Sequence, residues 1–219
     1  MNWYENAVMY HIYPLGFCGA PKCNEGGEPV NRLEKVLDWI PHLKELGVDA
    51  VYFGPVFESV EHGYDTTDYR VIDRRLGTNE MFAHICDELH KNGIRVILDG
   101  VFNHCGSFNK WMDRERIYEG EEDYEPGAYV SADSPYRSYF RFFKEGPENW
   151  PYNGNYDGWW GHDTLPKLNY EDSVKLENYI LYIGRKWVSP PYNVDGWRLD
   201  VAADLGRSNE YNHEFWQKF

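Results

Sequence analysis

Along the first hundred positions, short continuous runs of apolar residues alternate with longer stretches whose apolar residues have helical spacing. This alternation constrains the fold most strongly. Three short runs are almost continuously apolar, as buried strands are: residues 7–14, 48–53 and 94–98. Between them, residues 32–46 and 79–92 carry apolar side chains at helical spacing, and each stretch is followed by a glycine. Strands without a polar face, alternating with helices, predict a parallel sheet that is covered on its faces.

The pattern changes after the third strand. Residues 105–171 are rich in aromatic residues, glycines, prolines and acids without a clear helix, and we expect a small inserted domain there. Helical spacing returns over 173–188, a fourth strand is predicted at 193–199, and a last helix begins near Asn209. We therefore expect three parts: the first three β/α units in 1–104, the insertion in 105–171, and the helix, fourth strand and next helix in 172–219.

Loops and helix ends are predicted from residues that interrupt or cap regular structure. Glycines and prolines mark loops at 15–31 and 54–78. Asn31 is the expected N-cap of the helix over 32–46, and Pro41 is expected to bend that helix or to begin a new turn.

The net charge excludes several classes of partner. The chain has 219 residues with 22 Lys and Arg against 36 Asp and Glu, a net charge of 22 − 36 = −14, which argues against nucleic acid and anionic membrane surfaces. No apolar stretch approaches the roughly 18 residues of a membrane span, and no signal peptide is visible. We expect a cytoplasmic protein with mostly reduced thiols, in which Cys18 and Cys23 could pair or stay free; without a CxxC pair we expect no structural zinc.

Four parallel strands fit two architectures, an open doubly wound sheet or part of a (β/α)8 barrel. Neither a GxGxxG nor a GxxxxGK[ST] motif occurs, so the nucleotide-binding interpretation loses its best support. Polar residues follow the third and fourth strands, at the rim where barrel enzymes carry their chemistry: Asp99, Asn103, His104 and Asp200. Because a whole barrel needs about 250 residues and eight strands, this chain would be half of one.

Aromatic residues make up 17% of the chain and cluster where it is otherwise polar, as at Tyr152, Tyr156, Trp159 and Trp160. Such rings either stack on sugars or form the small core of a loop. Composition alone does not separate these two alternatives.

Four motifs together resemble the alpha-amylase family of glycoside hydrolases. DGVFNH at 99–104 and GWRLD at 196–200 resemble its third-strand and fourth-strand motifs. GYDTTDY at 63–69 and LPKLN at 165–169 resemble the segment after its second strand and the end of its inserted domain. Order, spacing and insertion all match, and the form of the motifs is most similar to the neopullulanase, cyclomaltodextrinase and maltogenic amylase branch. The resemblance implies an α/β fold, an incomplete (β/α)8 TIM barrel of about strands 1–4 with the insertion after strand 3.

The resemblance also implies roles for individual residues. Asp200 matches the nucleophile, and Arg198, two residues earlier on the same strand face, would hold it ionised. His104 and Tyr64 match the histidine and the aromatic platform at the cleavage subsite, and Asp99 matches a supporting carboxylate. Taken singly, each of these residues also has an ordinary structural explanation as a cap, an ion pair or loop core; only the combination indicates a site.

Further residues match the family less directly. Asp204 replaces the Glu or His found in relatives and would line the acceptor side of the substrate. Asn103 matches a calcium ligand of many members, but because calcium sites differ between branches the resemblance implies no required cofactor and leaves calcium open. Four residues of the insertion either shape the cleft or pack within it: Trp159, Trp160, His162 and Asp163.

A retaining glycosidase needs two carboxylates, and only one is matched here. The family's acid/base glutamate and a later His-Asp pair have no counterpart, and Glu210 and Glu214 fall in the predicted last helix. The resemblance thus implies the N-terminal half, truncated at the C-terminus, of an α-glucan hydrolase that is inactive alone. The expected bonds are α-1,4 glucosidic bonds, and the sequence leaves open whether α-1,6 bonds are cleaved as well.

Two alternatives belong to other functional classes. The chain could be a non-catalytic carbohydrate-binding or subunit-like half-barrel module, or a family member that has lost catalysis and serves as an interaction protein. Retention of Asp200, Arg198, His104 and Tyr64 disfavours the last. Because half a barrel exposes two sheet edges, we expect the chain to dimerise or to associate with a missing C-terminal half.

Overall fold

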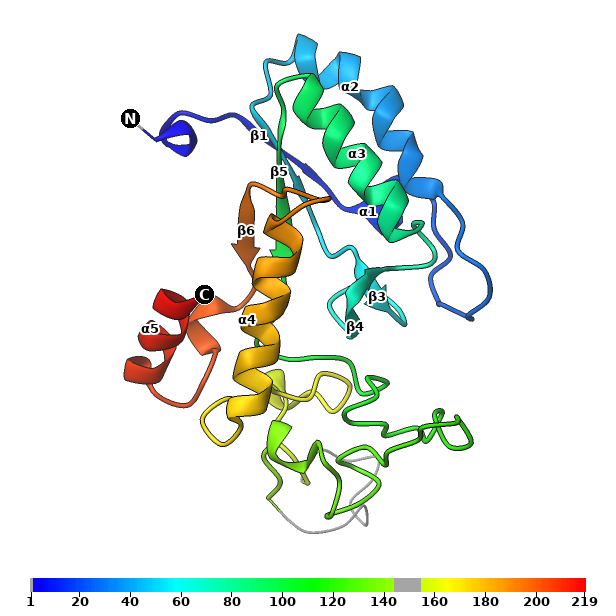
Figure 1. Ribbon diagram of the computed structural model, residues 1–219, viewed down its shortest axis with the longest axis vertical. Coiled ribbons are helices and arrows are strands. Elements are labelled where there is room, and N and C mark those ends of the chain that lie inside the picture. The colour runs from blue at the N-terminus through cyan, green and yellow to red at the C-terminus, as the bar shows by residue number, and fades with distance from the viewer. Residues whose placement is uncertain (1, 144–154) are drawn as a thin grey trace. The chain divides into compact units, whose positions relative to one another are not determined.

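The predicted parallel sheet is present in a computed structural model, which describes residues 2–143 and 155–219 (Figure 1). Its strands are β1 (Met9–Ile12), β2 (Ala50–Phe53), β5 (Arg95–Gly100) and β6 (Gly196–Leu199), in the order β1-β2-β5-β6 and all parallel. The central strands are almost wholly buried, whereas β1 and β6, the two open edges, keep exposed positions. The four-stranded half of a barrel that the sequence predicts is confirmed.

The chain divides into two compact units. The first holds the sheet and comprises Met1–Gly63, Tyr69–Gly100 and Ile183–Leu199. The second comprises Tyr64–Asp68, Val101–Tyr182 and Asp200–Phe219. The boundaries of the insertion at 105–171 are not tested by this division and stay a prediction.

The predicted helices form close to their expected ends. They are α2 (Lys35–Glu45) after the 3-10 turn η2 (Arg32–Glu34), α3 (Asn79–Lys91), α4 (Val174–Val188) and α5 (Asn209–Lys218). Pro41 lies inside α2, which runs through it without a new start. The Thr78 hydroxyl caps α3 by accepting a hydrogen bond from the Met81 N–H at 3.2 Å. Asn31 precedes η2, but its side chain makes no capping hydrogen bond, so that part of the prediction is wrong.

The loops predicted at 15–31 and 54–78 contain regular structure that the sequence analysis missed. The second holds β3 (Phe57–Ser59) and β4 (Thr66–Ile72), which form a two-stranded sheet. β3 is only three residues long, and β4 mixes charged with apolar residues, so neither gives a clear periodic signal. The first strand ends at Ile12 rather than at Pro14, because Pro14 begins the short helix α1 (Pro14–Phe17) in its first turn.

Aromatic packing forms much of the core of the first unit. α2 and α3 lie side by side (Figure 1), and α3 packs against β5. Phe82 of α3 meets Phe53 of β2 with ring centroids 6.2 Å apart. Trp187 is fully buried beside Phe57, and its indole N–H donates to the Tyr69 carbonyl at 3.0 Å.

A buried arginine ties the loops of the first unit together. Arg75 is 4% exposed and donates to both carboxylate oxygens of Asp73, at 2.9 and 2.7 Å. It also donates to the Ser59 hydroxyl at 2.8 Å. Its remaining acceptors are the carbonyls of Pro21, Lys22 and Glu61. One cation therefore neutralises a buried carboxylate and donates hydrogen bonds to three loop carbonyls.

The second unit relies on local hydrogen bonds rather than on long elements. Its described residues between 105 and 171 contain the 3-10 turns η3 (Arg137–Tyr139) and η4 (Trp159–Gly161) but no α-helix or strand. Single antiparallel bridges join His104 to Lys167 and Gly158 to Pro166. The aromatic cluster is divided: Tyr156 is buried as loop core, Trp160 is exposed, and Tyr152 lies outside the described residues.

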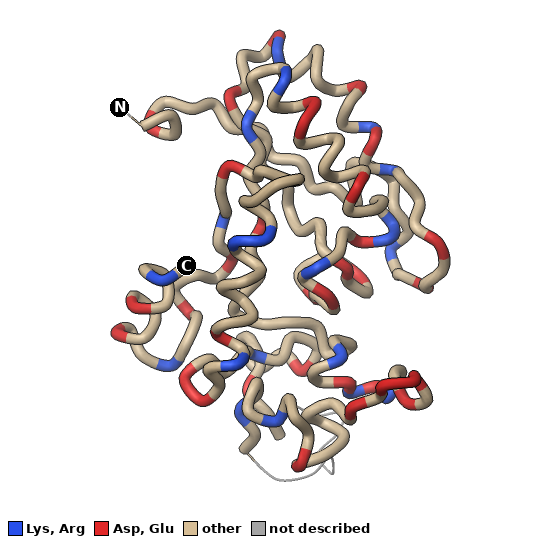
Figure 2. Tube along the Cα trace, in the orientation of Figure 1, with Lys and Arg blue, Asp and Glu red and all other residues tan. Residues whose placement is uncertain are grey.

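The thiols and the charges are distributed along the described chain as follows. All four cysteines are free, with Cys86 and Cys105 buried, and burial raises the pKa of the Cys18 thiol to about 11. Along the described chain, Figure 2 shows Lys and Arg interspersed with Asp and Glu. None of the helices in the described parts has the length and apolar character that a bilayer crossing requires.

Replacing the buried arginine should destabilise the protein strongly. Arg75→Met leaves the Asp73 carboxylate buried and unpaired, and we expect the free energy of unfolding to fall by about 3–5 kcal/mol. Urea denaturation followed by circular dichroism measures this change. The control Lys91→Met breaks only exposed pairs on α3 and should leave the midpoint almost unchanged. Equal midpoints for the two variants would contradict the role given to Arg75.

Candidate active site

A charged cluster occupies the carboxyl end of the sheet in the first unit. Asp99 of β5 is fully buried, and the Arg198 guanidinium donates to both its carboxylate oxygens, at 3.3 and 3.2 Å. The Tyr52 hydroxyl also donates to Asp99. His11 stacks on Tyr52, with ring centroids 4.4 Å apart and planes at 14°. The four side chains thus form one contiguous group.

Strand register explains this cluster. Asp99 and Arg198 are direct partners in the parallel pairing of β5 with β6, and His11 and Tyr52 are direct partners in that of β1 with β2. Partnered residues in neighbouring strands present their side chains on the same face of the sheet. Sequence reasoning missed Tyr52 and His11, because register cannot be deduced from the strands one at a time.

The charged groups of this cluster compensate one another. The buried Asp99 carboxylate is balanced by the guanidinium and by a phenol donor, as a buried charge requires. Burial, and after it the positive charge of Arg198, lowers the pKa of His11. Arg198 therefore contacts the Asp99 carboxylate, and its predicted action on Asp200 stays a prediction.

In the second unit, the structure brings two of the four motifs together. His104 is 1% exposed and forms the antiparallel bridge with Lys167 of LPKLN. The backbone N–H of Leu168 donates to the Asn103 carbonyl at 2.9 Å. The His104 ring stacks on Trp159, with centroids 5.7 Å apart and planes at 27°. The third-strand motif is thereby attached to the end of the inserted segment.

The segment around Tyr64 is fixed by a close backbone approach. Tyr64 is half-buried, and the Gly106 N–H donates to the Thr66 carbonyl at 2.9 Å. A Cβ at Gly106 would lie 2.5 Å from the Asp65 carbonyl oxygen, so only glycine fits there. Tyr64 is thus held on a segment docked against the start of the insertion.

Asp200 begins a tight turn. It is half-buried and follows the last residue of β6, so it lies just beyond the strand. Val201 adopts the left-handed conformation with φ 48°, and the 3-10 turn η5 (Ala202–Asp204) comes next. A β-branched residue in this conformation is strained, which is frequent near functional sites.

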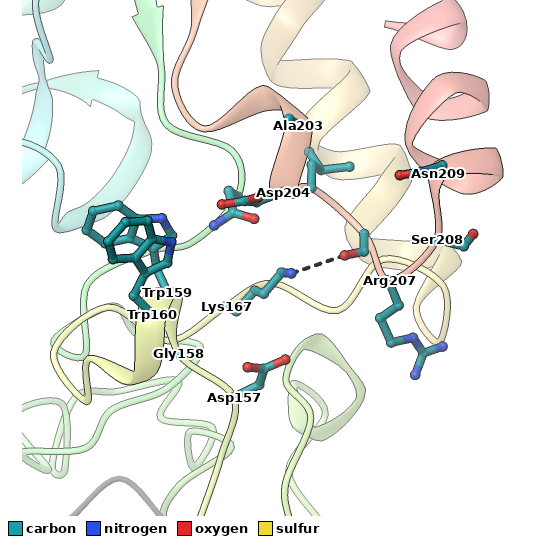
Figure 3. A pocket seen from close by; sticks show the side chains of 13 residues that line it. Asp157, Gly158, Trp159, Trp160, Lys167, Ala203, Asp204, Arg207, Ser208 and Asn209 are labelled. Atoms are coloured by element: carbon teal, nitrogen blue, oxygen red, sulfur yellow. Dashed lines mark hydrogen bonds between the residues drawn. The ribbon is translucent and has the colours of Figure 1, made fainter.

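Asp204 lines a pocket of about 400 Å³, and all residues of this pocket belong to the second unit (Figure 3). The Lys167 ammonium donates to the Gly206 carbonyl at 3.1 Å. Figure 3 shows the indole rings of Trp159 and Trp160 together on one side of the pocket. The rest of the lining is Asn103, Asp157, Gly158, Ala203, Leu205, Arg207, Ser208 and Asn209.

The residues around Asn103 do not fit calcium. The Asn103 side-chain oxygen is buried without a hydrogen-bond partner, so it could accept one bond. Calcium takes six to eight oxygen ligands, however, and the described residues contain no group of three or more acidic, histidine or cysteine side chains suited to a metal. The cationic Lys167 also lines the same pocket, which opposes a divalent cation.

Comparisons with known proteins agree with the motifs. The family model described as the alpha amylase catalytic domain matches residues 12–217. The maltogenic alpha-amylase of Bacillus acidopullulyticus is 35% identical over 237 residues, covering 100% of this chain and 36% of that protein. Neopullulanase 2 of Thermoactinomyces vulgaris is 33% identical, with coverages of 100% and 36%.

A solved structure shows the same fold. The ligand-free cyclic alpha-maltosyl-(1→6)-maltose hydrolase of Arthrobacter globiformis superposes with a TM-score of 0.75 at 31% identity, covering 99% of this chain and 48% of that one. The chain therefore spans about half the length of this structure, and 36% of the length of the two curated relatives.

The charge of Arg198 should be measurable at His11. In ¹H–¹³C NMR titrations we expect the His11 midpoint to lie below 6.5, and to rise towards 6.5 in Arg198→Gln because the repulsive charge is lost. Arg198→Lys keeps the charge and should keep the midpoint low.

The sign for stability follows from the lowered pKa. The unfolded chain binds a proton at His11 more readily than the folded chain does. The contribution of His11 to the free energy of unfolding is therefore present above pH 6.5 and is lost as the pH falls through the midpoint of the folded state. A His11 midpoint at or above 6.5, or one that Arg198→Gln leaves unmoved, would be inconsistent with the cluster.

Proposed function

The chain belongs to the alpha-amylase catalytic-domain family, and we propose that it carries the nucleophile half of a retaining glycoside hydrolase acting on α-glucans. The observation that carries this proposal is the family match over residues 12–217, which includes all four motifs. The proposed bonds are α-1,4 glucosidic bonds, together with α-1,6 bonds. In support, one matched hydrolase is named for a substrate with a (1→6) linkage between maltose units.

The proposed chemistry centres on Asp200. Its carboxylate would attack the anomeric carbon and form a glycosyl-enzyme, which water then hydrolyses with retention of configuration. Its half-buried place in a tight turn supports this role, because a nucleophile must reach substrate while staying fixed. The reaction needs two carboxylates and no cofactor.

Two further residues of the second unit would hold the sugar. His104 is fixed by the stacking of Trp159 and by the bridge to Lys167, which supports a role in orienting a sugar hydroxyl. The half-buried Tyr64 would stack on the same ring. In the first unit, Asp99 and Arg198 form the supporting ion pair and are proposed to position the strand ends rather than to take part in bond breaking.

The second carboxylate is not matched in these 219 residues. Glu210 and Glu214 lie in α5, as expected, and we assign neither to acid/base catalysis. Among the described residues, β1 and β6 are the outer strands of the sheet, and we propose that these edges accept further strands or a second copy of the chain. We therefore propose that turnover requires residues equivalent to those of the relatives beyond the matched region.

Hydrolysis should depend on a complementing segment. Without general acid assistance, which contributes about 10²–10⁴-fold, the 219-residue chain should release almost no reducing sugar from maltooligosaccharide or cyclodextrin. Adding the part of a cyclomaltodextrinase that lies C-terminal to the matched region should restore turnover, and Asp200→Asn should abolish it. A reducing-sugar assay measures all of these.

The matched control is Asp133→Asn, an exposed aspartate of the second unit that should leave the restored rate unchanged. Turnover by the unmodified chain alone, abolished by Asp200→Asn, would mean that a carboxylate within these residues acts as the acid. Binding of oligosaccharide without turnover under every condition would favour the non-catalytic carbohydrate-binding module.

A further inference from the structure

Trp160 is held in an unusual exposed position. Its side chain is 82% exposed, and its backbone lies in the left-handed region with φ 49° and ψ 31°. Large aromatic residues are seldom so exposed, and this backbone conformation is uncommon for residues other than glycine.

Backbone hydrogen bonds hold the residues on either side of Trp160. The Trp159 N–H donates to the Leu165 carbonyl at 3.0 Å, and the Gly161 N–H donates to the Gly158 carbonyl at 3.0 Å. The two indoles stack with centroids 5.5 Å apart and planes at 26°. Trp160 therefore stacks on Trp159 and leaves most of its ring open to a ligand, and the backbone beside it is already held in place.

The adjoining pocket offers polar groups suited to hydroxyls. The Asn103 side-chain oxygen is buried without a hydrogen-bond partner, in a residue that is 1% exposed and lines the pocket. The Lys167 ammonium, bonded to the Gly206 carbonyl, can donate further hydrogen bonds. The exposed carboxylate of Asp204 can accept them. Hydrogen-bond acceptors and a donor thus line a pocket that two indole rings also line. Such a lining suits a sugar ring, whose hydroxyls need both kinds of partner and whose C–H face packs on aromatic rings.

The charge of the lining favours a neutral ligand over an anionic one. Two cations, Lys167 and Arg207, are matched by two carboxylates, Asp157 and Asp204. The Arg207 guanidinium is already bonded to both oxygens of Asp172, at 2.8 and 2.9 Å. It is therefore not available to bind a phosphate, even though the N-terminus of α5 borders the pocket.

We propose that Trp160 is a stacking platform for one glucose ring of an α-glucan, and that the pocket beside it binds the hydroxyls of the adjoining rings. Trp160 is then a residue that sets the preferred chain length of the substrate. This inference rests on the proposed α-glucan function and adds a binding contact that the four motifs do not contain.

Isothermal titration of the full 219-residue chain with maltose, maltotriose and maltohexaose tests the platform. Trp160→Ala should weaken maltohexaose binding about tenfold, and Trp160→Phe, which keeps an aromatic face, should weaken it by less than about threefold. Tyr4→Ala removes another exposed ring, in the first unit, and should have no effect.

Indole ¹H–¹⁵N spectra provide a second measurement. The cross-peak that disappears in Trp160→Ala identifies Trp160, and it should shift when maltohexaose is added to the wild type. Circular dichroism checks that each variant is folded, which we expect because the Trp160 ring is largely exposed.

Two failures can be told apart. In the first outcome, the wild type binds maltohexaose and His104→Gln weakens this binding, but Trp160→Ala does not and the Trp160 cross-peak does not shift. That outcome would overturn the platform and leave the α-glucan function standing. If the wild type binds no oligosaccharide at about 10 mM, the carbohydrate function and the platform fall together.

Discussion

The parallel pairing of β5 with β6 is the constraint on which the rest of the structure depends. It joins residues that are about a hundred positions apart and aligns Asp99 with Arg198. Because a buried carboxylate is costly without a partner, this alignment is favoured only in the observed register. Within the first unit, the same pairing joins the strand before the long connection to the strand after it.

The two units are stabilised by different kinds of interaction. In the first, apolar strands and amphipathic helices bury a core of aromatic and aliphatic side chains, and Arg75 satisfies the polar groups of the loops. In the second, little regular structure exists between 105 and 171 among the described residues, and single bridges and stacked rings take its place. Such a unit has many exposed polar groups and aromatic faces, which suits recognition of a polyhydroxylated chain.

Membership of the alpha-amylase family relates the sheet of the first unit to the loops of the second. The Asp99–Arg198 ion pair lies in the sheet of the first unit, whereas the candidate nucleophile and the candidate sugar-binding residues lie on the turns and loops of the second unit. This division between a stable scaffold and adaptable loops is general in barrel enzymes. The sequence left open whether Trp160 stacks on a sugar or packs within its loop, since a loop tryptophan has no periodic pattern that distinguishes the two.

The sequence by itself determined the parallel strands, the main helices, the absence of long helices from the described insertion and the family, because apolar periodicity and motif spacing are local properties. It missed β3 and β4, whose strands are short or mixed in polarity, and it assigned a cap to Asn31 that the 3-10 start of the helix does not use. Only the tertiary structure decided that Tyr52 and His11 join Asp99 and Arg198, that Asn103 is buried beside Lys167 around one pocket, and that Trp160 faces solvent. Those facts depend on strand register and loop conformation, which are set by contacts between residues far apart in the chain.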